Sequence, residues 1–99
     1  MQVKWVRIMA DVHHAEIHFE GHVQGVGFRY AAFEVSREFD VAGFVENLPD
    51  GRVRIEAEGD ERELEAFAAA VEDRMRHFIR RTNRSVHVRV SQFTGFSIR

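Results

Sequence analysis

The order in which hydrophobic spacing changes along the chain constrains its fold more than any other feature. Over residues 15–23 apolar and polar residues alternate, which is typical of a half-buried strand. Over residues 28–39 the apolar residues recur at helical spacing in a single stripe. Alternation returns over residues 41–47 and 53–58, and Leu-Pro-Asp-Gly at 48–51 predicts the tight turn of a hairpin between these strands.

The rest of the chain repeats this order. Asp60 as N-cap and Glu63 three residues later form a capping-box-like pair, which is typical of the start of a helix. An apolar stripe at helical spacing runs over residues 64–78 and predicts a second, long helix. Alternating valines over residues 86–90 predict a fourth strand, and residues 96–98 have the pattern of a short last strand.

The predicted order is therefore β-α-β-β-α-β, with one apolar face on each element. Elements of this kind bury their apolar faces against one another, so both helices should cover the same face of an antiparallel sheet. We predict an α+β fold of the ferredoxin-like sandwich type, formed by one domain of 99 residues. Because this fold serves many functions, the function has to be argued from individual residues.

The composition excludes several kinds of site. The chain has no cysteine, which excludes disulfides and thiolate chemistry. Its six histidines are scattered and match no zinc-binding spacing, so we expect no metal and no other cofactor. No apolar run approaches the length of a membrane span, and residues 1–12 lack the apolar segment of a signal peptide. We therefore expect a cytoplasmic protein without a membrane partner.

Charge is distributed unevenly along the chain. All sixteen acidic residues lie at or before Asp73, and residues 74–99 carry seven arginines. The net charge of −2 therefore divides into −9 up to Asp73 and +7 after it. Such a basic segment is compatible with an anionic partner, but it is more often a solvated face or a complement to acidic neighbours in the fold.

The glycine-rich segment over residues 21–27 is the first candidate binding site. Three glycines in seven residues let the backbone fold tightly and turn several N–H groups inward. The helix that follows presents its positive N-terminal end to the same point, and Arg29 in its first turn adds a guanidinium suited to a phosphoryl group. The spacing alone is equally compatible with a plain strand-to-helix turn, and it matches neither a Walker loop nor a dinucleotide fingerprint.

Asn47 is the second candidate. It ends the predicted strand at 41–47, directly before the tight turn. An asparagine in that place is ordinarily a turn residue, so the pattern by itself favours a structural role. Strand alternation turns the neighbouring Glu46 to the opposite side.

Both candidates lie in longer motifs that resemble those of a known family. Residues 21–29, GHVQGVGFR, resemble the first signature of the acylphosphatases, and residues 43–53, GFVENLPDGRV, resemble the second. The motifs stand in the family's order and at its spacing, on the elements that the periodicity predicts. The resemblance extends over about residues 14–99.

The resemblance implies hydrolysis of the carboxyl-phosphate bond of small acyl phosphates without a metal. Asn47 would orient the attacking water, and Arg29 would hold the phosphate together with the glycine-rich loop. Residues 13–99 would form the family's domain, with residues 1–12 as an extension, and a monomer is favoured. The loop residues implied in phosphate binding, mainly through backbone N–H groups, are Val23, Gln24, Gly25, Val26, Gly27 and Phe28.

Two features depart from the family pattern. Glu46 stands where the family usually has a basic or neutral polar residue. Its carboxylate would repel a dianion weakly, so we expect a modest effect on substrate affinity. The second helix, over residues 64–78, is predicted to be longer than the family's, and the usual Pro/Gly-rich approach to the fourth strand is absent.

Other functions remain open at this point. A non-catalytic binding or regulatory module, for an anion or for RNA, could use the same fold. RNA-binding domains of this topology need aromatic residues on their central strands, and residues 53–58 contain none, so we expect no nucleic-acid partner. The family's domain also occurs in larger carbamoyl-transfer proteins that mature hydrogenases. Residues 1–99 contain no zinc-finger segment, so we expect a stand-alone enzyme.

Overall fold

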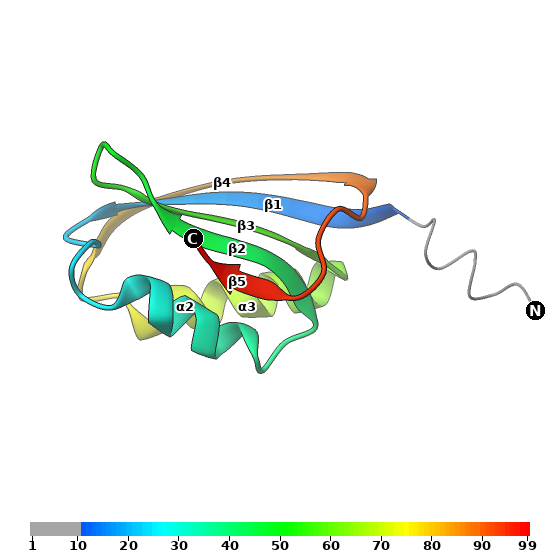
Figure 1. Ribbon diagram of the computed structural model, residues 1–99, viewed down its shortest axis with the longest axis horizontal. Coiled ribbons are helices and arrows are strands. Elements are labelled where there is room, and N and C mark those ends of the chain that lie inside the picture. The colour runs from blue at the N-terminus through cyan, green and yellow to red at the C-terminus, as the bar shows by residue number, and fades with distance from the viewer. Residues whose placement is uncertain (1–10) are drawn as a thin grey trace, which may run out of the picture.

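The computed structural model describes residues 11–99. These residues form strands and helices in the predicted order (Figure 1). Along the chain they are β1 (Asp11–Gly21), α2 (Phe28–Ser36), β2 (Val41–Asn47), β3 (Val53–Gly59), α3 (Glu61–Arg74), β4 (Ile79–Val90) and β5 (Phe96–Ile98).

The strands form one sheet in the order β4-β1-β3-β2-β5, and both helices cover the same face of it (Figure 1). β1 pairs with β3 and β4, and β2 pairs with β3, all antiparallel. β5 pairs with β2 in parallel, with Phe96 opposite Gly43. The predicted ferredoxin-like α+β sandwich is confirmed. The parallel pairing of β5, which alternation alone does not specify, makes the sheet mixed at that edge.

Strand alternation determines which side chains form the core. On β1, Ala15, Ile17 and Phe19 are at most 2% exposed and belong to the core between sheet and helices. Phe67 of α3 is fully buried in the same core, with its ring 5.5 Å from that of Phe96 on β5. Removal of this apolar surface from water stabilises the fold by roughly 25 cal/mol per Å².

The second helix ends earlier than predicted. α3 stops at Arg74, and Phe78, which was expected on its buried stripe, is 37% exposed. β4 already begins at Ile79, because it pairs with β1 along the whole length of that strand. Backbone pairing satisfies N–H and C=O groups whatever the side chains are, so the polar residues 80–85 can lie in an edge strand.

The predicted helix start at Asp60 is confirmed, but Glu63 has a different partner than expected. The Asp60 carboxylate accepts a hydrogen bond from the backbone N–H of Arg62 at 2.8 Å. Glu63 Oε1 accepts the backbone N–H of Asp40 at 2.7 Å. Glu63 therefore ties α3 to the segment that enters β2, instead of closing a capping box.

The strand β1 includes two residues of the segment predicted as an extension. Asp11 and Val12 pair with Val90 and Arg89 of β4. The role of the preceding residues, 1–10, lies outside the described residues. Within residues 11–99, no helix has both the length and the apolar character needed to cross a membrane.

Candidate functional site

A pocket of about 260 Å³ lies at the end of the sheet where the chain passes from β1 to α2. Four segments meet there: the loop after β1, the first turn of α2, the end of β2 and the end of β5. Arg29 and Asn47, the two predicted site side chains, therefore line the same pocket although they belong to different elements. The lining residues are Val23, Gly25, Gly27, Phe28, Arg29, Tyr30, Asn47 and Ile98.

The loop owes its shape to glycines in the left-handed region of backbone conformation. Gly25 and Gly27 both have a φ of 79°, and a Cβ added to either would meet no atom within 4 Å. Backbone conformation, rather than lack of space, therefore requires glycine at both positions. Gly27 is also the N-cap of α2, so the positive end of that helix borders the pocket.

Two buried side chains fix the loop to the core. Val23 is fully buried, and Phe28 is 2% exposed with its ring 4.9 Å from that of Phe19. Val26 between them packs against the core as well. A loop anchored in this way holds its backbone N–H groups in place, which is what preorganised binding of an anion requires.

Gln24 has a structural role that sequence analysis missed. Its Nε2 donates to the carbonyl oxygens of Leu48 at 2.8 Å and Arg52 at 2.9 Å. These carbonyls flank the β2–β3 turn, and the two N–H donors of one amide are enough to bind both. The Gln24 side chain thus positions the turn that follows Asn47. Gln24 and Val26, both predicted as loop residues of the site, do not line the pocket.

Arg29 lies in the first turn of α2 with an exposed side chain. Its Nη1 donates to the main-chain oxygen of Arg99 at 3.0 Å, a contact that no sequence pattern indicated. Arg99 is itself held to β2, because its N–H donates to the Val45 carbonyl at 2.8 Å. One donor of the guanidinium is used in this way, and the planar arrangement of its other donors suits a phosphoryl group.

Asn47 is the last residue of β2 and pairs with Val53 across the hairpin. It is half-buried and uncharged, so it can donate and accept hydrogen bonds in the pocket but cannot act as a base at neutral pH. The neighbouring Glu46 turns away, as predicted. Its Oε2 lies 2.6 Å from Nη2 of Arg54 on β3, so a cation compensates its charge outside the pocket.

Tyr30 and Ile98 also line the pocket, and sequence analysis did not identify either. Tyr30 follows Arg29 directly in the first turn of α2, so its position beside a candidate arginine was a signal available in the sequence. No sequence signal marks Ile98. It reaches the pocket because β5 adds to β2 in parallel, with Ile98 opposite Val45.

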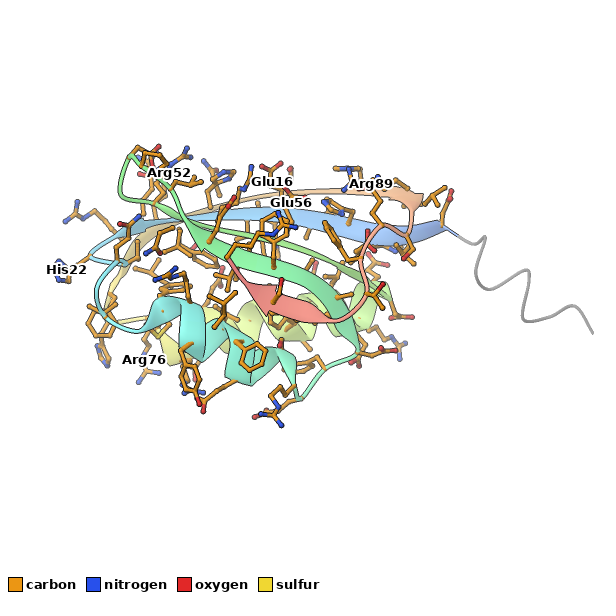
Figure 2. All side chains as sticks on the ribbon, viewed as in Figure 1. Glu16, His22, Arg52, Glu56, Arg76 and Arg89 are labelled. Carbon is orange, nitrogen blue, oxygen red and sulfur yellow. The ribbon has the colours of Figure 1, made fainter. Side chains whose placement is uncertain are left out.

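The face of the sheet away from the helices carries charged side chains, among them Glu16, Glu56 and Arg89 (Figure 2). His14, which is 2% exposed, lies between two carboxylates on this face. Its Nε2 is 3.2 Å from Glu56 Oε1, and its Nδ1 is 3.5 Å from Glu58 Oε2. Within residues 11–99, no three His, Cys, Asp or Glu side chains are grouped so that they could hold a metal ion.

Glu58 is a buried carboxylate at the other end of β3 from the pocket. Its Oε1 accepts hydrogen bonds from the Ser91 hydroxyl at 3.0 Å and from the N–H groups of Gln92 at 2.8 Å and Phe93 at 2.9 Å. Burial raises the pKa of this carboxyl, but these hydrogen bonds outweigh burial and lower the pKa overall. Glu58 therefore holds the connection between β4 and β5 and belongs to the fold.

Known proteins resemble this chain in both sequence and fold. The acylphosphatase family model matches residues 15–98. An acylphosphatase of Archaeoglobus fulgidus is 55% identical over 56 residues, which span 57% of this chain and 63% of that protein. One of Methanospirillum hungatei is 41% identical over 78 residues, 79% of this chain and 84% of that protein. The crystal structure of acylphosphatase from Bacillus subtilis superimposes with a TM-score of 0.78 at 33% identity, and the match covers 87% of this chain and 97% of that one. The chain belongs to the acylphosphatase family.

Proposed function

We propose that this protein hydrolyses the carboxyl-phosphate bond of small acyl phosphates to a carboxylate and inorganic phosphate. The observation that carries the proposal is the meeting of left-handed glycines, Arg29 and Asn47 in one pocket. None of the residues that line this pocket, all within residues 11–99, is acidic, which favours an anionic ligand. Membership of the acylphosphatase family supports the same reaction.

In the proposed reaction the loop and Arg29 hold the phosphoryl group. Backbone N–H groups around Gly25 and Gly27, the positive end of α2 and the guanidinium would surround its oxygens. The transition state of phosphoryl transfer spreads charge over these oxygens, and fixed donors stabilise that charge without having to reorganise. The donors would thus perform the role that a metal ion has in other phosphoryl transfers.

Asn47 would orient the attacking water. Its side-chain oxygen would accept a hydrogen bond from the water, and its NH₂ group would donate one to the water. The residue would therefore orient the water and would not transfer a proton. The water oxygen bonds to phosphorus as the bond from phosphorus to the acyl oxygen breaks. The carboxylate leaves as a weak base and needs no general acid, and the proton of the water passes to a phosphate oxygen of the substrate.

Hydrolysis of benzoyl phosphate in the presence of a chelator tests this proposal. We expect Arg29→Ala to lower kcat/KM about 10⁴-fold, because the guanidinium stabilises charge in the transition state. Asn47→Ala should lower it about 10²-fold through lost orientation. Arg37→Ala is the matched control, because it removes a guanidinium at the other end of α2, and it should retain wild-type activity.

Inorganic phosphate binding, measured by calorimetry, separates the proposed enzyme from a module that only binds. Arg29→Ala should weaken phosphate binding, whereas Arg37→Ala should not. A wild-type protein that bound phosphate but hydrolysed no acyl phosphate would be a regulatory or binding module with this fold. Activity that required an added metal ion would contradict the proposed role of the fixed donors.

A further inference from the structure

The pocket has two chemically different parts. Gly25, Gly27 and Asn47 offer backbone and amide groups, and the apolar side chains of Val23 and Phe28 are almost fully buried beneath them. The other apolar lining residues are exposed: Tyr30 is 59% exposed and Ile98 is 43% exposed. A ligand in this pocket would therefore meet polar groups in the loop and apolar surface at the mouth.

Tyr30 and Ile98 line the same pocket as Arg29 and are sequence neighbours of the two residues that its hydrogen bond joins. Tyr30 is the next residue of α2, with its ring 6.5 Å from that of Phe33. Ile98 directly precedes Arg99, whose main-chain oxygen accepts the Arg29 Nη1 hydrogen bond at 3.0 Å. The two apolar side chains therefore share the pocket with the residue proposed to bind phosphate, and they come from the two segments that its hydrogen bond connects.

An acyl phosphate has the same division into two parts. If the loop binds the phosphoryl end, the acyl end points toward the open mouth, where Tyr30 and Ile98 lie. Contact with an apolar acyl group removes the surface of these side chains from water, and an aromatic group can also stack on the Tyr30 ring. A short acetyl group covers much less of this surface.

We propose that Tyr30 and Ile98 form the acyl subsite and that it favours aromatic or longer aliphatic acyl groups over acetyl. This inference rests on the proposed function, because it assumes that the loop binds the phosphoryl end. Exposed apolar residues are common on protein surfaces, and Val86, Val88 and Val90 on β4 are equally exposed. Tyr30 and Ile98 differ from these valines because they share a pocket with Arg29 and Asn47.

A substrate series at constant leaving-group chemistry tests the subsite. Acetyl, propionyl and butyryl phosphates release carboxylates of similar basicity, so their kcat/KM values report contacts of the acyl chain. We expect kcat/KM to rise about twofold for each added methylene group. This is less than the increase expected for a fully buried methylene group, because the mouth of the pocket is open to solvent. Benzoate is a weaker base than these carboxylates, so benzoyl phosphate is compared with acetyl phosphate only through the change that a substitution makes in the ratio of their kcat/KM values.

Substitutions assign the preference to the two side chains. Tyr30→Ala should reduce the ratio of benzoyl to acetyl kcat/KM about tenfold, because the stacking surface is lost. Ile98→Ala should flatten the rise from acetyl to butyryl phosphate. Tyr30→Phe should keep the ratio, since the ring remains, and Val88→Ala is the control for truncation of an exposed apolar residue elsewhere. Thermal unfolding monitored by circular dichroism establishes that each variant is folded.

The outcomes distinguish the subsite from the proposed function. Hydrolysis with no dependence on the acyl group, or an equal loss for benzoyl and acetyl phosphate in Tyr30→Ala, would overturn the subsite and leave the hydrolase intact. A large loss of inhibition by inorganic phosphate in Tyr30→Ala or Ile98→Ala would also overturn it, because the residues would then shape the phosphate site. Failure to hydrolyse any acyl phosphate would overturn both proposals.

Discussion

The β4–β5 connection and the glycine-rich loop lie at opposite ends of the sheet (Figure 1) and differ in the acidic groups beside them. At one end Glu58 supplies the charge and accepts the N–H groups of Gln92 and Phe93. At the other end Gly25 and Gly27 shape the loop beside Arg29, and the described residues that line that pocket include no acid. The first arrangement is completed within the fold, whereas the second is the one we propose to bind an anionic ligand.

The comparison shows that the source of the anion determines what such donors contribute. The donors around Glu58 bind a carboxylate of the same chain, so their hydrogen bonds contribute to the free energy of unfolding. We propose that the donors of the glycine-rich loop gain their ionic partner from a ligand, so that they contribute to binding free energy and to catalysis. Substitutions at the two ends should therefore separate stability from activity.

The largest effect expected in this comparison tests whether the pocket recognises phosphate by geometry or by charge alone. Arg29→Lys keeps the positive charge but loses the planar donor arrangement and the Nη1 bond to Arg99. We expect kcat/KM for benzoyl phosphate to fall about 10²-fold. The free energy of unfolding, measured in urea, should change by less than about 0.5 kcal/mol because the side chain is exposed. Full activity of the lysine variant would show that charge alone is sufficient.

The second prediction concerns the other end of the sheet, where we expect a substitution to lower stability and leave KM nearly unchanged. Glu58→Ala leaves the donors of the β4–β5 connection without their acceptor, so we expect the free energy of unfolding to fall by about 2 kcal/mol. KM for benzoyl phosphate should stay within about twofold, because distant sites act independently. β5 also keeps its own bonds to β2, from Gly43 N–H to the Gly95 carbonyl and from Arg99 N–H to the Val45 carbonyl.

Glu16→Ala is the matched control for Glu58→Ala. Glu16 lies on the same face of the sheet, but its ion pairs are with side chains only, at 3.4 Å from Arg54 and 3.8 Å from His18. Such partly exposed pairs contribute less than about 1 kcal/mol. If both variants lost the same stability, Glu58 would act through the charges of this face and not through the β4–β5 connection.

The sequence was sufficient to predict the fold because each element buries one face. The alternation over residues 15–23 placed Ala15, Ile17 and Phe19 on the core side, and the structure confirms that side. The end of α3 was missed because helical spacing of apolar residues continues to Phe78. Pairing of β4 with β1 from Ile79 onward decided where the helix stops, and pairing between distant segments leaves no local signal.

The same limit applies to the site. Arg29 lies at a helix start after a glycine-rich loop, and that local pattern has a physical meaning of its own. Glu58 looked like any polar residue on the solvent side of β3, and only the return of residues 91–93 over it, more than thirty residues later in the chain, makes it buried. Gln24 and Ile98 depend on contacts of the same long-range kind with the β2–β3 turn and with β2.

A third prediction uses pH to test the charge of Glu58. Its pKa is lowered from the ordinary 4.5 by its hydrogen bonds, so the ionised carboxyl stabilises the fold above about pH 4.5. This stabilisation is lost as the pH falls from there through the folded pKa. We expect Glu58→Gln to lower the free energy of unfolding by about 1 kcal/mol at pH 7, and the difference from wild type to shrink below about pH 4.5.

Urea denaturation of both proteins from pH 7 to pH 3 measures this difference. Two other carboxyls also have lowered pKa values, Glu34 through a hydrogen bond from Arg74 and Asp50 through the backbone N–H of Arg52. Both are present in each protein, so their effects cancel in the comparison. A difference that stays constant with pH would mean that the donors of the β4–β5 connection do not depend on a charged acceptor.

The smallest expected effect concerns Glu46, the residue before Asn47. The sequence predicted a modest loss of substrate affinity from its charge, whereas its carboxylate pairs with Arg54 at 2.6 Å outside the pocket. We expect Glu46→Gln to change KM for benzoyl phosphate by less than about twofold at either low or high salt, measured by steady-state kinetics. A several-fold fall in KM at low salt that disappears at high salt would show that this carboxylate still repels the substrate. A carboxylate on the charged face of the sheet would then act on the pocket, and this face and the pocket could no longer be treated as independent.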